Sequence, residues 1–275
     1  MRIVVTNDDG YKAKGIQSLV SILRPYGELT IVAPKSAQSG MSMAVSMGYK
    51  PIAVKHLESK PGEDWWYLDG TPSSCVKFAI DNILHPVKPD LVVCGINHGS
   101  NAATAACYSG TVGAASEGAI NGIPSLAVSL DSFSEDADFC AIEAMLPGIM
   151  DRLLPVFSKR FGILYNINFP NIPLSEIKGV KMSRMGIVHW EKEYMDYTPE
   201  FLASRRHSPS EADLEYVKNA LPGEKFYVMA GDLVENPGNP DDADHKLMEA
   251  GYVSITPLNL DNTETAEIDR LCDII

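Results

Sequence analysis

The sequence predicts an α/β protein built on an open, mostly parallel sheet with helices on both faces. Short buried runs rich in β-branched residues alternate with helical stretches between residues 2 and 167. The first strand, helix and second strand follow one another between residues 2 and 33, which is the length of a βαβ unit with parallel strands. Repeated alternation of this kind places helices on both faces of one sheet.

Each expected element rests on a local pattern. The first helix is expected from four apolar residues at i, i+3, i+4 and i+7 spacing, namely Ile16, Leu19, Val20 and Leu23. Thr71-Pro72 starts another helix, because proline is tolerated in the first helical turn. The predicted strands are residues 2–6, 29–33, 90–95, 125–129, 163–167 and 252–256, and the predicted helices are 16–23, 71–84, 109–122, 135–157 and a short one near 242–250.

Two segments interrupt this alternation. Between residues 41 and 57, methionine and valine alternate with serine and alanine, which predicts a strand at the rim of the sheet. Its methionines either fill gaps in the core or contact a nucleobase. From residue 186 the chain becomes charged, aromatic and rich in turns, although its aromatic residues argue against complete disorder. We therefore expect a core at residues 1–185, a protruding arm used in subunit association at 186–240, and a C-terminal segment at 241–275 that returns to the core or to a partner subunit.

Composition restricts the function. The chain has 23 Lys and Arg against 36 Asp and Glu, and its net charge is -13 at pH 7. A protein this acidic lacks the positive surface that binds nucleic-acid polymers or anionic membranes, so a small-molecule substrate is expected.

The sequence shows no signal-peptide pattern and no apolar run near the ~20 residues of a membrane span. Its five cysteines are scattered, and we expect a cytoplasmic protein without disulfides.

Polar segments follow the ends of the predicted strands. Asn7-Asp8-Asp9-Gly10 follows the first strand, and Ser36 to Gly40 follows the second. Gly95 to Asn101 follows the third, and Ser109-Gly110-Thr111 opens the next helix. In an open parallel sheet, ligands bind beyond the carboxyl ends of the strands, near the point where the strand order reverses. We therefore expect all four segments to meet at one edge of the sheet.

Together these segments offer two carboxylates, a hydroxyl and an amide oxygen. An all-oxygen set suits a hard divalent cation such as Mg²⁺ or Mn²⁺, which would also offset the repulsion between adjacent Asp8 and Asp9. The helix N-terminus at Ser109 to Thr111 has free backbone N–H groups and suits a phosphate. Zinc is disfavoured because His98 is the only histidine nearby. The P-loop and GxGxxG signatures are absent, so ATP hydrolysis and dinucleotide redox chemistry are not indicated.

Each segment also has a purely structural interpretation. Asp-Asp-Gly is common in solvated turns, Ser39-Gly40 suits an ordinary loop, and Ser109 suits a helix N-cap. His98 is either a metal ligand, an acid–base group or an ordinary loop histidine. The expected convergence of all four segments favours a functional site.

Six ordered blocks of the sequence resemble the SurE (survival protein E) family. They are TNDDG at 6–10, QSG at 38–40, GTPSSCV at 70–76, GINHGSN at 95–101, YSGTVGAASEG at 108–118 and GYVSITPL at 251–258. The resemblance spans nearly the whole chain and covers the arm least well. It implies a metal-dependent nucleotidase that removes phosphate from nucleoside monophosphates, with 5′-, 3′- and polyphosphate substrates in the family's range. It also implies a Rossmann-like N-terminal domain and an arm exchanged between subunits of a homodimer or homotetramer.

The resemblance also implies roles for individual residues. The positions that match the family's ligands for one divalent metal ion per subunit are Asp8, Asp9, Ser39 and Asn97. The positions that match its phosphate contacts are Asn101, Ser109, Gly110 and Thr111. The chain departs from the family pattern at Ser74, Cys94, Ala103 and Ala105, where Asp, Ser, Gly and Asp are more usual. None of these departures is an expected metal ligand, so they bear on the substrate range.

The reaction expected from these residues is hydrolysis of a phosphomonoester. Two nucleophiles remain open at this point. Either a water activated by the metal attacks, with Asp8 or Asp9 as general base, or one of these aspartates attacks to give an aspartyl-phosphate. A haloacid-dehalogenase-like phosphatase is an alternative, although it requires a DxDx[TV] spacing. A non-catalytic protein that senses nucleotide or metal is another.

Overall fold

The structure is a computed structural model that describes residues 1–48, 50–134, 136–158, 160–204, 209–272 and 274. It divides into two compact units. Residues 1–186 and 240–275 form the first unit, and residues 187–239 form the second. The two units are described separately, and every candidate site residue named above belongs to the first.

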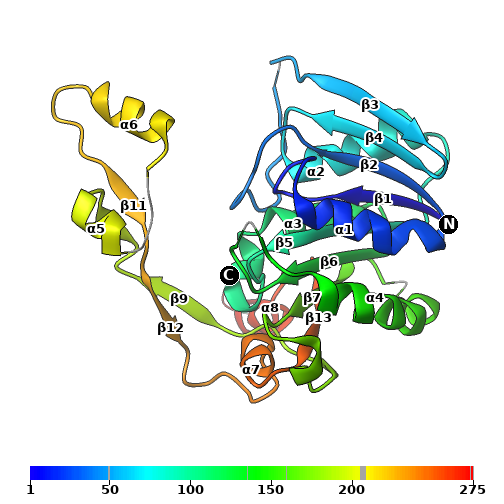
Figure 1. Ribbon diagram of the computed structural model, residues 1–275. Coiled ribbons are helices and arrows are strands. Elements are labelled where there is room, and N and C mark those ends of the chain that lie inside the picture. Colours follow the sequence, from blue (N-terminus) through cyan, green and yellow to red (C-terminus); the bar gives the residue numbers. More distant parts are fainter. Residues whose placement is uncertain (49, 135, 159, 205–208, 273, 275) are drawn as a thin grey trace. The chain divides into compact units, whose positions relative to one another are not determined.

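The first unit contains a sheet with helices packed on it (Figure 1). Its strands are β1 (Arg2–Thr6), β2 (Glu28–Pro34), β3 (Val54–Lys60), β4 (Glu63–Leu68), β5 (Leu91–His98), β6 (Ser125–Leu130), β7 (Ile163–Phe169), β8 (Val180–Met182) and β13 (Val253–Asn259). Its α-helices are α1 (Lys14–Leu23), α2 (Pro72–Phe78), α3 (Gly110–Ile120), α4 (Cys140–Leu153), α7 (Asp244–Glu249) and α8 (Thr265–Leu271). A π-helical turn, Ala79–Leu84, extends α2, and four 3-10 turns cover Arg24–Tyr26, Ala103–Cys107, Leu154–Val156 and Leu174–Glu176.

The strand order of this sheet is β3-β4-β2-β1-β5-β6-β7-β13-β8. The pairs β1–β2, β1–β5, β5–β6 and β6–β7 are parallel, whereas β3–β4 and β7–β13 are antiparallel. The sheet is therefore mixed but mostly parallel, and the predicted α/β class is confirmed.

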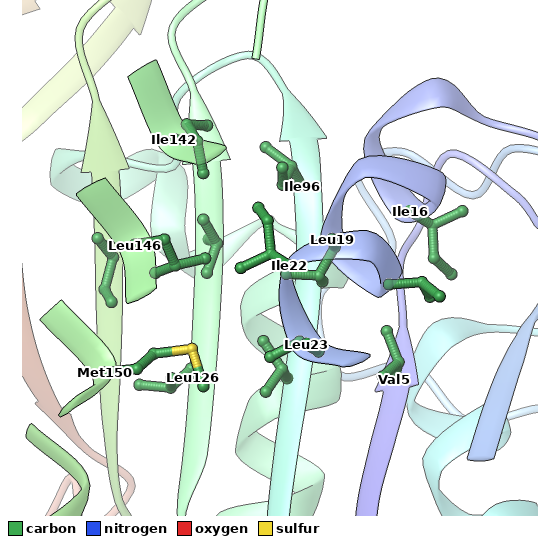
Figure 2. Packing of buried hydrophobic residues seen from close by; sticks show 14 of the residues in the cluster. Val5, Ile16, Leu19, Ile22, Leu23, Ile96, Leu126, Ile142, Leu146 and Met150 are labelled. Atoms are coloured by element: carbon green, nitrogen blue, oxygen red, sulfur yellow. The ribbon is translucent and has the colours of Figure 1, made fainter. Parts of the chain in front are cut away.

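Two hydrophobic layers cover the sheet, one on each face. In β1, Ile3 and Val5 face the cluster that contains α1 and α4, whereas Val4 faces the cluster that contains α2 and α3. This alternation is the period of two expected of a strand that is buried on both faces. In Figure 2, side chains of α1 and α4 pack over those of the strands; the labelled examples are Leu19, Ile22, Leu23, Ile142, Leu146 and Met150 over Val5, Ile96 and Leu126.

Most predicted elements match the structure within a few residues, but the start of the long helix does not. The helix predicted at 135–157 begins at Cys140, and residue 135 itself lies outside the described residues. The polar residues before it form turns instead. The N–H of Ala137 donates to the carbonyl of Ser134 at 3.1 Å, and the N–H of Cys140 donates to the carboxylate of Asp138 at 2.9 Å. Local side-chain bonds of this kind compete with helix formation.

The predicted rim strand at 41–57 is correct only from Val54 onward, where the edge strand β3 begins. Residues 41–48 form no strand, and this edge of the sheet is the β3–β4 hairpin, a pairing that the sequence did not predict. Ser42 has φ 49°, and it bonds to the loop before α3: its N–H donates to Tyr108 at 2.9 Å and its hydroxyl to Cys107 at 2.8 Å. Met47 is 86% exposed, so the methionines of this segment do not all fill the core.

The second unit has short, regular elements. Its strands are β9 (Val188–Glu191), β10 (Tyr194–Asp196), β11 (Tyr227–Met229) and β12 (Asp232–Glu235), and its helices are α5 (Pro199–Ser204) and α6 (Glu211–Lys218). β9 pairs with β12, and β10 pairs with β11, both antiparallel. Throughout the described parts of both units, every helix is too short or too polar to cross a bilayer.

Candidate active site

The order of the strands places the site. From β1 the chain continues to β2 on one side, and β5 flanks β1 on the other, with Thr6 opposite Cys94 in the parallel register. The strand order therefore reverses between β1 and β5, where open α/β sheets bind their ligands. Asn7 to Gly10 follows β1 at this point, and His98 ends β5.

The turn after β1 is held by the side chain of its first residue. Asn7 accepts a hydrogen bond from the N–H of Gly10 at 3.2 Å, and its amide donates to the carbonyl of Gly10 at 3.0 Å. Gly10 has φ 99°, a conformation that residues with a side chain rarely adopt. The two aspartates between them contact different elements, because Asp8 bonds to α3 and Asp9 bonds to β5.

Asp8 is buried, with 3% of its surface exposed, and is fixed by the start of α3. The hydroxyl of Thr111 donates to Oδ1 of Asp8 at 2.7 Å, and the N–H of Thr111 donates to Oδ2 at 3.2 Å. A Cβ at Gly110 would lie 2.9 Å from Oδ2 of Asp8, so only glycine lets the helix terminus approach this carboxylate. Both oxygens of Asp8 are therefore oriented by one residue.

Asp9 contacts His98 at the end of β5. Its Oδ2 atom lies 3.1 Å from Nδ1 of His98 and accepts a hydrogen bond from the backbone N–H of the same residue at 3.3 Å. The imidazole also packs edge-on against Phe139, with ring centroids 5.4 Å apart. His98 is therefore held against Asp9 by its ring and by its backbone.

The adjacent negative charges of Asp8 and Asp9 favour a bound cation. Burial raises the pKa of Asp8 to about 6, and the negative charge of Asp9 acts in the same direction, while the hydrogen bonds from Thr111 oppose them. Within the described chain, no Lys or Arg forms an ion pair with either aspartate. Adjacent carboxylates without a cationic side chain are a poor arrangement unless a bound cation balances them.

The donor set at this edge fits a hard divalent ion. The described residues contain no cluster of three or more His, Cys, Asp and Glu side chains suited to a metal, so neutral oxygens must complete the coordination. Asn97 is 9% exposed, and its amide nitrogen donates to the carbonyl of Gly99 at 2.7 Å, which leaves its Oδ1 without a hydrogen bond in the described chain. Ser39 is exposed on the loop after β2, next to Gln38, whose N–H donates to the carbonyl of Asp8 at 2.7 Å. Carboxylate, hydroxyl and amide oxygens are the ligands that Mg²⁺ and Mn²⁺ prefer.

The predicted phosphate-contacting residues have different local roles. Ser109 caps α3, because its hydroxyl oxygen accepts from the N–H of Val112 at 3.1 Å. Both donors of Thr111 are used by Asp8, whereas the N–H of Gly110 donates to no acceptor in the part of the chain that is described. The N-terminus of α3 therefore keeps the Gly110 N–H and the Ser109 hydroxyl hydrogen for a ligand.

Asn101 lies deeper than the other predicted residues, with 6% of its surface exposed. Its N–H donates to the side chain of Asn168 at 2.8 Å, and its amide donates to Ser129 at 2.8 Å. These bonds tie the loop after β5 to β6 and β7. Hydrogen bonds do not join Asn101, Asn97 or Ser39 directly to either aspartate among the described residues.

Sequence reasoning missed three residues around this edge. Gln38 holds the backbone of Asp8, Asp244 holds the loop after Asn101, and Phe133 borders a cavity next to Asp9. Gln38 belongs to the QSG block at 38–40 but has no signal of its own, and nothing in the local sequence around Asp244 or Phe133 distinguishes either residue. Their positions depend on contacts between segments far apart in the chain.

Comparison with known proteins decides the family. The family described as Survival protein SurE matches this chain over residues 3–192, which is well over half of its length. The chain belongs to the SurE family. A protein named 5'-nucleotidase SurE from Christiangramia forsetii is 37% identical over 269 residues, covering 95% of this chain and 92% of its own. A protein of the same name from Bacteroides fragilis is 35% identical over 273 residues, covering 98% of this chain and 95% of its own.

The SurE fold is also shared. The crystal structure of the SurE protein from Aquifex aeolicus superposes with a TM-score of 0.77 at 29% identity, covering 100% of this chain and 99% of that one. The resemblance expected from the six sequence blocks is thereby confirmed. SurE membership also leaves the haloacid-dehalogenase alternative without support, because Asp8 and Asp9 are adjacent and lack the DxD spacing that alternative needs.

Proposed function

We propose that this SurE-family chain is a metal-dependent 5′-nucleotidase, which hydrolyses the phosphate ester of nucleoside 5′-monophosphates. The observation that carries the proposal is the buried carboxylate of Asp8, held at the N-terminus of α3 beside Asp9, where no Lys or Arg of the described residues pairs with either aspartate. An anionic phosphate and a divalent cation together complement this arrangement. The names of the curated relatives support the same activity.

Asp8, Asp9, Ser39 and Asn97 would hold one Mg²⁺ or Mn²⁺ ion per subunit. When bound, such an ion polarises the phosphate and offsets the charge that develops during hydrolysis. The chain's own contribution begins with Thr111, which orients both oxygens of Asp8. The N–H of Gly110 and the hydroxyl of Ser109 then donate to phosphate oxygens at the positive end of α3.

Asp9 is the better placed of the two aspartates to receive a proton. Both oxygens of Asp8 accept hydrogen bonds from Thr111, whereas the bonds that Asp9 receives from His98 go to Oδ2 alone. In the proposed reaction, the proton of the attacking water moves to Oδ1 of Asp9 as the oxygen bonds to phosphorus. The P–O bond to the nucleoside breaks, and the departing oxygen takes up the proton from Asp9, which regenerates the carboxylate.

The test is phosphate release from a substrate panel with Mg²⁺ or Mn²⁺. We expect 5′-AMP to be hydrolysed, EDTA to stop the reaction, and Asp9→Asn to lower kcat by at least about a hundredfold. Binding of nucleotides without phosphate release would overturn the proposal and favour a sensor. Hydrolysis in ¹⁸O-water, combined with trapping and mass analysis of the enzyme, separates attack by water from an aspartyl-phosphate. A phosphorylated Asp8 or Asp9 would contradict the role given to Asp9.

The same substrate panel also tests which phosphate esters and anhydrides the protein prefers. 3′-AMP and inorganic polyphosphate present the same phosphate group on different leaving groups, and the family resemblance makes both candidate substrates. We propose that 3′-AMP and polyphosphate are hydrolysed with a lower kcat/KM than 5′-AMP, because the relatives are named as 5′-nucleotidases. Rates for 3′-AMP or polyphosphate that exceed the rate for 5′-AMP would reverse this order.

We also propose that the second unit mediates association into a homodimer or homotetramer. Its described surface exposes large apolar side chains, among them Leu221 at 67% and Met229 at 65%. Exposed apolar residues gathered in a small unit are typical of an association surface. Light scattering should show a dimer or tetramer, and Leu221→Glu combined with Met229→Glu should lower the mass. Val156→Glu, at an equally exposed position in the first unit, should not; a monomeric wild-type chain would refute the proposal.

A further inference from the structure

A cavity of about 490 Å³ opens beside Asp9. Its lining residues are Asp9, Lys12, Ala13, Lys14, His98 and Phe133. The volume lies within the range of sites that hold small molecules. Because Asp9 forms one wall, a ligand whose phosphate is bound between the aspartates and α3 can extend the rest of its structure into this space.

Phe133 is the aromatic wall of this cavity and is 85% exposed. It follows β6, where the N–H of Asp131 donates to Phe169 at 2.9 Å and the N–H of Ser132 donates to Leu130 at 2.7 Å. These bonds keep the segment at the carboxyl edge of the sheet, the edge that carries Asp8 and Asp9. The ring gains little from core packing at this exposure, so its free face is available to a ligand.

The loop after β5 is shaped to receive the Phe133 ring. A Cβ at Gly99 would lie 2.4 Å from Cε1 of Phe133, which is closer than any side chain can approach. The N–H of Gly99 donates to the carbonyl of Leu130 at 2.9 Å, which joins this loop to the segment that carries Phe133. The ring is therefore seated one residue beyond His98, the partner of Asp9.

We propose that the base of the nucleoside monophosphate stacks on the Phe133 ring in this cavity. The inference rests on the proposed nucleotidase function and adds the site of the nucleoside. Stacking on an aromatic ring tolerates every base, because each has a π-face, and it favours the larger purines. The substrate class is therefore nucleoside monophosphates of any base, with purines preferred.

The cations of the cavity suit the rest of the nucleoside. Lys14 pairs with Asp136, whereas the ammonium of Lys12 lies 5.5 Å from the centroid of the Tyr11 ring and forms no ion pair with any described residue. Lys12 can therefore donate hydrogen bonds to ribose hydroxyls or to ring acceptors of the base. A second cavity of about 400 Å³ lies beside Ser109, but its lining includes neither aspartate and no aromatic ring. The chemistry of the first cavity fits a nucleoside better.

The test compares 5′-AMP with ribose 5-phosphate, which has the same phosphate and sugar but no base. We expect Phe133→Ala to lower the ratio of kcat/KM for 5′-AMP to that for ribose 5-phosphate by roughly tenfold, mainly through KM. Phe133→Trp should keep the ratio. Phe161→Ala, which removes another exposed phenylalanine at 66% exposure, is the matched control and should behave as the wild type.

Adenosine binding provides a second readout that does not depend on turnover. Calorimetry should show adenosine binding to the wild type roughly tenfold more tightly than to Phe133→Ala, and circular dichroism should show that the variant is folded. The proposal is overturned if the two substrates lose activity equally in Phe133→Ala, or if adenosine binding is unchanged. A wild type that binds adenosine through Phe133 but releases no phosphate from either substrate would instead refute the nucleotidase function alone.

Discussion

Thr111 donates two hydrogen bonds to Asp8, from its hydroxyl to Oδ1 at 2.7 Å and from its backbone N–H to Oδ2 at 3.2 Å. A single residue in the first turn of α3 thus orients both oxygens of a buried carboxylate after β1. These hydrogen bonds join the carboxylate after a strand, which suits a cation, to the N-terminus of a helix, which suits a phosphate.

The Thr111 hydroxyl should matter for turnover more than for folding. Thr111→Val keeps the shape but removes the hydrogen bond that orients Oδ1 of Asp8, so we expect kcat for 5′-AMP to fall roughly tenfold or more. Thr111→Ser retains the hydroxyl and should recover most of the rate. Steady-state kinetics with Mn²⁺ measure both variants, and a Thr111→Val enzyme with unchanged kcat would remove Thr111 from the proposed site.

The metal-free protein should lose stability as Asp8 ionises. The folded pKa of Asp8 is about 6 against an ordinary value of 3.8, so the unfolded state releases this proton more readily. The stabilising effect of the neutral form is complete below pH 3.8 and disappears as the pH rises to about 6. The difference corresponds to about 3 kcal/mol of unfolding free energy.

Asp8→Asn tests this pH dependence. In urea unfolding with EDTA, the stability of Asp8→Asn relative to the wild type should rise between pH 4 and pH 7 by an amount on the order of 3 kcal/mol. A further measurement well below pH 3.8 serves as the internal control, because Asp8 is then neutral in both the folded and the unfolded state. A difference between the two proteins that stays constant with pH would show that Asp8 titrates normally.

Divalent ions should stabilise the fold through the two aspartates. A ligand present at a hundred times its Kd stabilises the native state by about 2.7 kcal/mol, so Mn²⁺ should raise the Tm of the wild type by several degrees. Asp8→Asn and Asp9→Asn should each lose most of this shift. Asp81→Asn, which alters an exposed aspartate on the π-helical turn, should retain it. Equal shifts in all four proteins would place the metal elsewhere.

Asp244 should be needed to hold the loop between β5 and α3. This carboxylate is fully buried; its two oxygens lie 3.0 and 2.9 Å from the N–H of Ala103, and it also accepts from the N–H of Gly186 at 3.0 Å. Ala103 has φ 51°, a left-handed conformation that costs about 1–2 kcal/mol for a residue with a side chain. The buried carboxylate therefore stabilises a strained loop next to Asn101.

We expect Asp244→Ala to lower the free energy of unfolding by roughly 2–4 kcal/mol, because it leaves buried N–H groups without acceptors. Ala103→Gly relieves the strain and should restore about 1 kcal/mol when combined with it. Urea unfolding of the two single variants and the double variant measures this cycle. An Ala103→Gly effect that is the same with and without Asp244 would show that the Asp244 contact and the conformation of Ala103 are independent.

Much of the site was predictable because one rule of topology applies to it. Ile3, Val4 and Val5 are buried on both faces of the sheet, and this pattern identifies β1 as an internal strand of a parallel sheet. Once β1 and β5 are internal parallel strands, Asp8, Asp9 and Asn97 must lie at the same edge. The rim strand predicted at 41–57 starts too early in the sequence. Side-chain alternation does not reveal that Ser42 bonds to the loop before α3.

The sequence by itself determined the α/β class, the internal strands and the polar residues at their carboxyl ends. These features follow from the local hydrophobic period and from the alternation of strands and helices along the chain. Only the tertiary structure decided that Thr111 donates hydrogen bonds to Asp8, that His98 contacts the carboxylate of Asp9, and that Phe133 borders the same cavity as Asp9. These contacts join segments 89 to 124 residues apart, from Asp9–His98 to Asp9–Phe133. Partners at that separation depend on how whole elements pack, and no local pattern in the chain records them.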